Sequence, residues 1–256
     1  YPLRRQRQMC IRDRFKWAWD VNRPNDNTEP KTGEQYSRGT PNSWAAMIGD
    51  EKLGLVYIPT GNSAADYYSA MRSTNENRVS SAVVALDVNT GREKWVFQTA
   101  HKDVWDYDIG SQPTLVDYPD ASGKKVPALI MPTKRGQTFI LDRATGKALT
   151  KVEERPAPVP SDAKAYHAVP NDPRAKTQPW SVEIPRLGLP DLQEKTMWGI
   201  SPIDQMLCRI KFKQANYLGE FTPPSIDKPW IEFPGYNGGS DWGSVAVNPV
   251  SYTHLT

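Results

Sequence analysis

Short runs of β-branched and aromatic residues alternate with one recurring turn, and this alternation most restricts how the chain can fold. The turn reads Asp-x-x-x-Gly at residues 50–54, 87–91 and 142–146. An Asp side chain can accept hydrogen bonds from backbone N–H groups two residues further on, and Gly supplies the positive φ that closes a short hairpin. The pattern therefore predicts an all-β chain of antiparallel strands.

The expected strands are short and are bounded by Gly, Asp, Asn or Pro. They cover residues 53–61, 81–87, 93–100, 126–133 and 137–142. The Asp residues of the three turns lie 37 and 55 residues apart, which is roughly the spacing of four-stranded propeller blades with one enlarged connection. A generic antiparallel sandwich of ordinary hairpins fits the same spacing, so spacing alone leaves both architectures open.

Residues 151–200 interrupt the pattern, because they hold eight prolines and predict a long irregular excursion. Residues 201–212 then carry a helix signal, with Ser201 as a typical N-cap and Pro at the first helical position. We expect strands to resume near Tyr217, Trp230 and Val245.

Composition excludes several classes of function. Residues 1–14 hold five Arg and one Asp, so the net charge of +3 leaves the remainder near −1, without a basic face for nucleic acid. No run of 18 apolar residues is present to span a membrane, and two Cys make no disulfide framework. Residues 1–14 and 251–256 resemble translated sequencing-adapter remnants. We therefore expect two foreign tails around one domain at 15–250, and an internal fragment of a longer protein.

Residues 100–115 place carboxylates beside aromatic rings, just before a stretch that reads like a strand. A solvated loop is one interpretation of this segment, and a site for a cation and a flat cofactor is another. Its charged and aromatic members are Asp103, Trp105, Asp106, Tyr107 and Asp108.

The segment ALDVNTGREKW at 85–95 matches the repeat Ala-x-Asp-x-x-Thr-Gly-x-x-x-Trp of pyrroloquinoline quinone (PQQ) dehydrogenases. The family's order is also kept by TPNSWA (40–45), IPTGN (58–62), HKDVWDYD (101–108) and PTKRG (132–136). On these motifs the chain most closely resembles the membrane-bound PQQ glucose dehydrogenases, a group that also contains quinate/shikimate enzymes. The resemblance covers residues 15–249.

The resemblance implies about half of an eight-bladed β-propeller, with a long Pro-rich insertion and one short helix. The Trp of the repeat, Trp95, would dock adjacent blades together. The resemblance further implies N-terminal transmembrane helices in the parent protein and a location at the periplasmic face of the bacterial inner membrane. Alcohol dehydrogenases of the family carry adjacent cysteines, and their absence here favours the glucose group.

The resemblance also assigns roles to single residues. Trp44 matches the tryptophan that lies flat under PQQ, which suits a rigid stacking surface. Asn62 matches an amide ligand of the divalent metal, and Ca²⁺ and Mg²⁺ prefer such oxygen ligands. Asp106 matches the catalytic carboxylate, which would also bind the metal and take the hydroxyl proton of the substrate as a general base. Each residue also has a purely structural alternative: Trp44 as a core or blade-docking residue, Asn62 as a turn residue and Asp106 as a capping residue at the start of a strand.

Three further positions, Asp108, Lys134 and Trp242, complete the expected site. If the backbone is extended there, Asp108 would point to the same side as Asp106. It would then lie next to the metal ligands without binding the metal itself. Lys134 matches a cation on the PQQ quinone oxygens, with a solvated hairpin Lys as the alternative. Arg135 is expected to be solvated, and Trp242 is expected to approach the cofactor from a later blade.

The implied activity is oxidation of an aldose such as D-glucose at C1 to the lactone, with hydride passing to PQQ and electrons to ubiquinone. Ca²⁺ or Mg²⁺, and not a lanthanide, would polarise the quinone carbonyl. A quinate/shikimate or other polyol substrate is the first alternative. A cofactor-free propeller scaffold of the outer-membrane assembly type is the alternative of a different class. The 256 residues alone are expected to be inactive.

Overall fold

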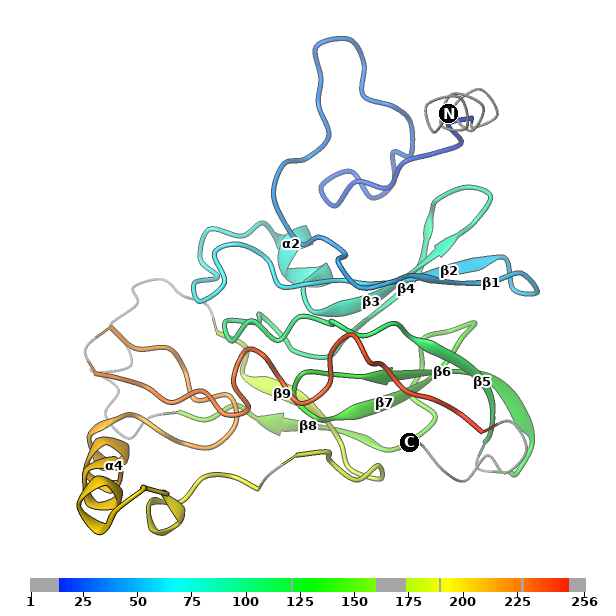
Figure 1. Ribbon diagram of the computed structural model, residues 1–256. Helices are drawn as coiled ribbons and strands as arrows, with labels where there is room; N and C mark the ends of the chain where they lie inside the picture. Colours follow the sequence, from blue (N-terminus) through cyan, green and yellow to red (C-terminus); the bar gives the residue numbers. More distant parts are fainter. Residues whose placement is uncertain (1–13, 121, 160–173, 189, 227, 249–256) are drawn as a thin grey trace, which may run out of the picture.

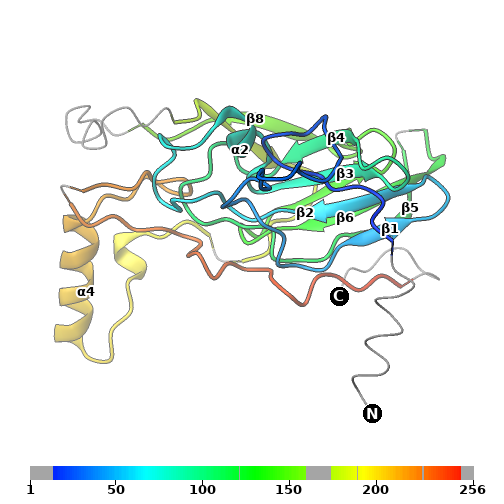
Figure 2. The same cartoon turned by 90° about the horizontal axis from the view of Figure 1, so that it is seen from above.

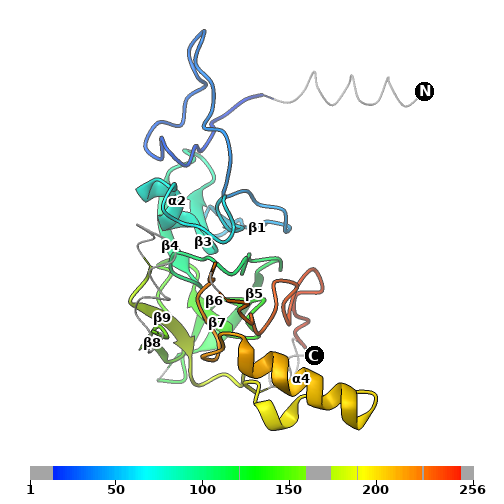
Figure 3. The same ribbon diagram turned by 90° about the vertical axis from the view of Figure 1, so that its left-hand side faces the viewer.

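Three antiparallel sheets form most of the regular structure. The computed structural model describes residues 14–120, 122–159, 174–188, 190–226 and 228–248. The sheets follow one another as layers, and the chain passes through them in sequence order (Figures 1 and 3). This all-β arrangement is the one that the turn pattern predicts.

The first sheet is a four-stranded meander in chain order, and every neighbouring pair is antiparallel. The strands predicted at 53–61, 81–87 and 93–100 are confirmed within it, and a short strand precedes them. Its strands are β1 (Ile48–Asp50), β2 (Leu55–Pro59), β3 (Ala82–Asp87) and β4 (Glu93–Gln98).

The second sheet contains β5 (Thr114–Pro119), β6 (Lys125–Pro132) and β7 (Thr138–Asp142), again antiparallel and in chain order. Its last two strands confirm the predictions at 126–133 and 137–142. The third sheet pairs β8 (Val152–Pro156) with β9 (Thr177–Ser181).

The prediction of an irregular excursion over residues 151–200 was therefore wrong at both strands of the third sheet. Pro179 lies inside β9, where it pairs with Glu154. Proline lacks the N–H that a central strand needs, but each strand of a two-stranded sheet has a free edge where no such donor is required. Residues 160–173 of the excursion lie outside the described residues.

The three Asp-x-x-x-Gly turns share one geometry, as predicted. The carboxylates of Asp50, Asp87 and Asp142 each accept backbone N–H groups two and three residues on, at 2.8–3.1 Å. The closing residues Gly54, Gly91 and Gly146 have φ of 63°, 67° and 71°. These are left-handed conformations that glycine adopts without steric cost.

Two of these turns are each covered by a different tryptophan. The Trp95 indole N–H donates to the Arg143 carbonyl at 3.0 Å, and its ring lies over the turn glycine of the second sheet. The Trp17 indole N–H donates to the Val88 carbonyl at 2.8 Å and covers the turn of the first sheet. Val88 and Arg143 each directly follow the Asp of their turn. Trp95 thus joins the first sheet to the second, and Trp17 repeats the same contact one step earlier in the chain.

The main core lies between the first two sheets. Alternate residues of each strand point into it, because successive side chains of a strand face opposite sides. The neighbouring residues, such as Val84 and Leu86 of β3, are buried on the other face, so β3 is covered on both sides. The shared core consists of Leu55, Tyr57, Val83, Ala85, Ile109, Leu129, Met131, Phe139 and Leu141.

Helix α4 (Pro202–Gln214) confirms the predicted helix, and the Ser201 hydroxyl accepts from the backbone N–H of Asp204 at 3.2 Å. It stands at one end of the molecule, away from the sheets (Figure 2). The expectation of a single helix was incomplete, because α2 (Thr74–Val79) and a 3₁₀ turn, η1 (Glu194–Thr196), also form. The capping box of Ser73 and Glu76 at the start of α2 was a readable signal in the sequence.

The strands expected near Tyr217, Trp230 and Val245 do not form in the described part of the chain. There the backbone makes an isolated bridge between Asn216 and Trp230, and the segment at 244–247 lies against β5 through the Thr114 hydroxyl bond to the Val245 carbonyl, at 3.3 Å. Among the described residues, no helix has the length and apolar character needed to cross a membrane.

Candidate active site

The candidate residues gather at the strand ends opposite the Asp-x-x-x-Gly turns. Asn62 follows the end of β2, the 103–108 loop lies between β4 and β5, and Lys134 follows the end of β6. In a meander, loops at one end of the sheet lie side by side although they are far apart in sequence. The site is therefore assembled from loops that the two sheets hold in place.

Asp108 is the residue that connects the candidates. One carboxylate oxygen accepts the Trp44 indole N–H at 2.6 Å, and the other accepts the Asn62 backbone N–H at 2.7 Å. Its carboxyl group also hydrogen-bonds that of Asp106. Three predicted site residues thus meet at the carboxyl group of Asp108.

Lys134 lies between the acid and the aromatic surface. Its ammonium donates to the Asp106 carbonyl at 2.9 Å and lies 5.6 Å from the centre of the Trp44 ring. Trp242 lies beside Trp44, with ring centres 5.8 Å apart and planes tilted by 43°, and its side chain is 70% exposed. The structure therefore brings an open aromatic surface, an ammonium group and a carboxyl group together, in an arrangement that suits a flat anionic molecule.

The backbone at Asp106 is not extended, although the sequence analysis required an extended backbone for Asp106 and Asp108 to face the same side. Asp106 has φ of 58°, in the left-handed region. The loop is turned around the fully buried Asp103, whose carboxylate accepts the backbone N–H groups of Trp105 and Tyr107, both at 2.8 Å. Asp106 and Asp108 still meet, because the tight loop rather than a strand returns them to one side.

Burial governs the charges in this loop. It raises the pKa of Asp103 to about 6, against the hydrogen bond from Ser81. Burial also raises the pKa of Asp106 to about 7, with the Lys134 ammonium opposing the rise and Asp108 adding to it. Carboxyl groups this close repel one another when ionised, so a nearby cation favours their charged forms.

Glu232 is a further acid of the site that the sequence analysis missed. Burial, together with the charges of Asp103 and Asp106, raises the pKa of Glu232 to about 8. Its Oε1 is buried without a hydrogen-bond partner among the described residues. The Tyr107 hydroxyl donates to the Pro234 carbonyl at 2.8 Å and holds this segment against the loop. No local motif marks Glu232, since only this long-range contact places it.

The side chain of Asn62 is engaged by the protein itself. Its Oδ1 accepts from the Ser63 backbone N–H at 2.8 Å and from the Ser80 hydroxyl at 3.1 Å, and its Nδ2 donates to the Asp66 carbonyl at 3.0 Å. A metal ligand role would require Oδ1 to exchange at least one of these donors for the ion. Across the described ranges, no three His, Cys, Asp or Glu side chains are arranged to hold a metal unaided.

Arg135 is not solvated, and that prediction was wrong. Its side chain is fully buried, and its Nε donates to Glu220 at 2.6 Å. The turn at residues 133–136 directs Lys134 and Arg135 to different sides, and the side of Arg135 is covered by Trp180 and Phe221. The sequence PTKRG contains no signal for this burial, because the covering rings come from distant segments.

Comparison with known proteins adds an independent finding. Residues 13–256 match a family described as glucose/ethanol/alcohol dehydrogenase, PQQ type, β-propeller domain. The chain is 69% identical to the glycerol dehydrogenase large subunit of Gluconobacter oxydans (strain 621H), over 93% of the chain and 31% of that protein. It is 44% identical to the quinate/shikimate dehydrogenase (quinone) of Acinetobacter baylyi, over 94% of the chain and 29% of that protein.

The quinoprotein glucose dehydrogenase of Escherichia coli (strain K12) is 38% identical over 91% of the chain, and the chain covers 28% of it. The chain thus spans less than a third of the length of these curated relatives. Among solved structures, a quinohemoprotein alcohol dehydrogenase from Pseudomonas putida HK5 is similar, with a TM-score of 0.50 at 22% identity, over 83% of the chain and 25% of that structure. This likeness supports the propeller fold.

Proposed function

Because the chain belongs to the PQQ-type glucose/ethanol/alcohol dehydrogenase family and forms part of its β-propeller domain, we propose that it carries the catalytic corner of a polyol-oxidising enzyme. The observation that supports this most is the meeting of three groups. The Lys134 ammonium lies 2.9 Å from the Asp106 carbonyl and 5.6 Å from the Trp44 ring. A cofactor-free scaffold has no use for this combination.

The residues present fit PQQ, a flat quinone with three carboxylates. Trp44 is half-buried and offers a ring face, and Gly110 packs against its edge, where an added Cβ would lie 2.6 Å from the ring. Lys134 supplies a fixed positive charge, which suits the anionic oxygens of the cofactor. When bound, PQQ supplies the electrophilic carbonyl that accepts hydride.

Asp106 is the general base of the proposal. Its carboxylate would take the proton from the substrate hydroxyl as hydride leaves the carbon. Ionised Asp106 is the form that does this, and both Lys134 and a bound divalent cation favour it. Lys134 holds the loop through the Asp106 carbonyl, and Asp108 hydrogen-bonds the Asp106 carboxyl group.

For the metal we propose Ca²⁺ or Mg²⁺, held by Asp106 and by the amide oxygen of Asn62. Carboxylate and amide oxygens are the ligand types that these hard cations prefer. Oxygen atoms without a partner in the described chain, Glu232 Oε1 and Asp241 Oδ1, are also buried at this end of the sheets. To bind the metal, the Asn62 amide oxygen would have to exchange its hydrogen bond from the Ser80 hydroxyl for the ion. The carboxylate of Asp106 needs no such exchange with Ser80.

A polyol is favoured over an aldose as the substrate. The chain is 69% identical to a glycerol dehydrogenase large subunit but 38% identical to a glucose dehydrogenase. The aldose assignment, made from motifs shared by the whole group, is therefore the second candidate. The name of the quinate/shikimate dehydrogenase (quinone) includes a quinone acceptor, and we propose that ubiquinone accepts the electrons here as well. We also propose that the enzyme works at the periplasmic face of the inner membrane.

The test is a substrate panel on the holoenzyme that contains this chain, reconstituted with PQQ and Ca²⁺ or Mg²⁺. Glycerol, quinate and D-glucose would be compared by kcat/KM with a dye or ubiquinone acceptor. The expected result is PQQ-dependent turnover with the highest kcat/KM for glycerol. A higher value for glucose would restore the aldose assignment, and no PQQ-dependent turnover with any of them would refute the proposal.

A further inference from the structure

Arg135 is the largest fully buried side chain among the described residues, and it lies next to Lys134 in the same turn. Its Nη1 donates to the Thr99 carbonyl at 2.5 Å and to the Pro179 carbonyl at 2.9 Å. Its Nε bonds Glu220 at 2.6 Å. One guanidinium group therefore connects the end of β4, strand β9 and the segment at residues 219–222.

The same guanidinium rests on the ring that supports the acid loop. Its carbon lies 4.3 Å from the centre of the Phe221 ring. Phe221 in turn packs edge-on against Trp105 at 4.9 Å and Tyr107 at 5.9 Å between ring centres. These two rings flank Asp106 in the sequence. The turn of Lys134 and the loop of Asp106 are thus held by one buried unit, Arg135–Glu220–Phe221.

Neighbouring contacts fix the turn from its other sides. The Lys134 carbonyl accepts from Gly239 at 2.7 Å, the Arg135 carbonyl from Arg186 at 3.2 Å, and the Gly136 carbonyl from Leu187 at 2.8 Å. Arg186 also pairs with Glu220 at 3.0 Å. The backbone of the turn cannot shift without breaking bonds to two separate segments, one at residues 186–187 and one at Gly239.

Stability alone does not account for this arrangement. Replacing a buried ion pair by apolar side chains of similar volume is often neutral or stabilising, since desolvation offsets the attraction. A fixed geometry at Lys134 is a separate consequence, and displacement of a catalytic group by about 1 Å costs on the order of 10²-fold in rate.

We propose that Arg135 and Glu220 are positioning residues that set the Lys134 ammonium against Asp106 and the cofactor surface. The inference rests on the proposed function, because it takes Lys134 to face PQQ. It assigns no contact between Arg135 and substrate or cofactor. Arg135 acts through Lys134, and its effect should disappear when Lys134 is absent.

A double-mutant cycle tests this dependence in the holoenzyme. Arg135→Met would be combined with Lys134→Ala, and PQQ affinity by fluorescence titration would be measured beside kcat and KM. Arg135→Met is expected to weaken PQQ binding and lower kcat about tenfold when Lys134 is present, as a partial displacement of the ammonium. In the Lys134→Ala background it should change either quantity less than twofold. Losses that simply multiply, or no loss at all, would overturn the proposal.

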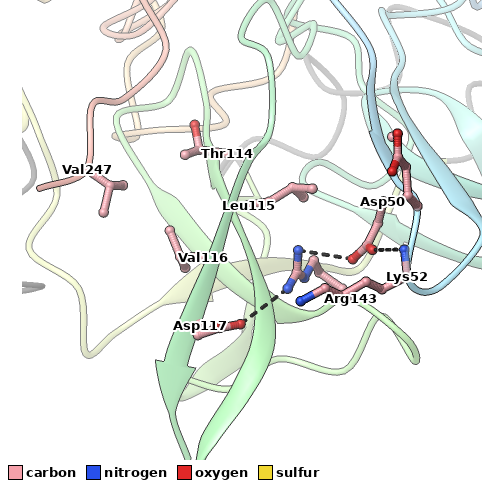
Figure 4. A pocket seen from close by; sticks show the side chains of 10 residues that line it. Asp50, Lys52, Thr114, Leu115, Val116, Asp117, Arg143 and Val247 are labelled. Carbon is pink, nitrogen blue, oxygen red and sulfur yellow. Dashed lines mark hydrogen bonds and ion pairs between the residues drawn. The ribbon is translucent and has the colours of Figure 1, made fainter. Parts of the chain in front are cut away.

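A replacement variant and a matched control keep the result interpretable. Glu220→Gln retains the shape of the partner and would take the place of Arg135→Met in the cycle if that variant does not fold. Arg143→Met removes a different ion-paired arginine, which is only partly buried and lies 3.0 Å from Asp50 at the opposite end of β7 (Figure 4). It should leave PQQ affinity and kcat unchanged. A wild type that binds no PQQ refutes the proposed function itself, whereas a working wild type with multiplicative losses refutes only the positioning role.

Discussion

The two ends of the same strands are built by different rules. At one end, the docking end, each Asp-x-x-x-Gly turn is closed by hydrogen bonds within its own five residues. At the other end, the site end, Trp44 bonds Asp108 and Lys134 bonds the carbonyl of Asp106, across 64 and 28 residues of sequence. The docking end therefore depends on local geometry, and the site end on loops that the sheets bring together.

This difference separates stability from chemistry. The docking end is covered by the Trp95 and Trp17 rings and carries the contact between layers. The site end instead collects buried carboxyl groups with raised pKa values, an arrangement that is more typical of function than of stability. Mutations at the two ends should accordingly affect different measurements.

The largest expected effect is at the site end. Asp106→Asn in the holoenzyme should retain PQQ but lower kcat by about 10²–10⁴-fold, because an amide is isosteric and far too weak a base. Single-turnover kinetics and a PQQ titration would separate the two effects. Asp117→Asn, on the exposed side of β5, is the matched control and should keep normal turnover. Unchanged turnover in Asp106→Asn would remove the base assignment.

Substituting one tryptophan at each end compares the two ends directly. Trp95→Ala should lower the free energy of unfolding by about 3 kcal/mol, since it removes a large packed ring and the bond to Arg143. Trp242→Ala, with its side chain 70% exposed, should change stability by less than about 0.5 kcal/mol while weakening PQQ binding. Urea unfolding and cofactor titration of both variants provide the measurements. Equal losses of stability would show that the ends are not distinct.

Lys134→Ala should weaken PQQ binding and lower kcat together, with a loss in kcat on the order of 10²-fold, because one fixed charge near the quinone oxygens is lost. Lys94→Ala, an ion-paired lysine on the outer strand β4, is the control and should alter neither. A reconstitution titration with unchanged affinity and rate would return Lys134 to the role of an ordinary hairpin residue.

The docking end could be predicted from the sequence because its rules are local. Asp142 and Gly146 predict the same turn as Asp87 and Gly91, and the two turns have the same hydrogen bonds and the same positive φ at glycine in the structure. The site end was predictable only where the resemblance supplied motifs, as for Trp44 and Asp106. Glu232 and the buried state of Arg135 were missed, because segments 44 to 127 residues apart in the sequence bury them. Periodicity carries no information about such contacts.

The smallest predicted effect isolates the docking contact itself. Gly54→Ala and Gly146→Ala both place a Cβ on a left-handed residue, with φ of 63° and 71°, and this backbone strain costs about 1 kcal/mol. At Gly54 the added Cβ has no atom within 4 Å, whereas at Gly146 it would lie 2.6 Å from the Trp95 ring. Gly146→Ala should therefore lower the free energy of unfolding by roughly 1 kcal/mol more than Gly54→Ala, as displacement of a packed ring requires. In a Trp95→Ala background the two substitutions should become equal, and a difference that persists there would mean that Trp95 is not what the turn glycine accommodates.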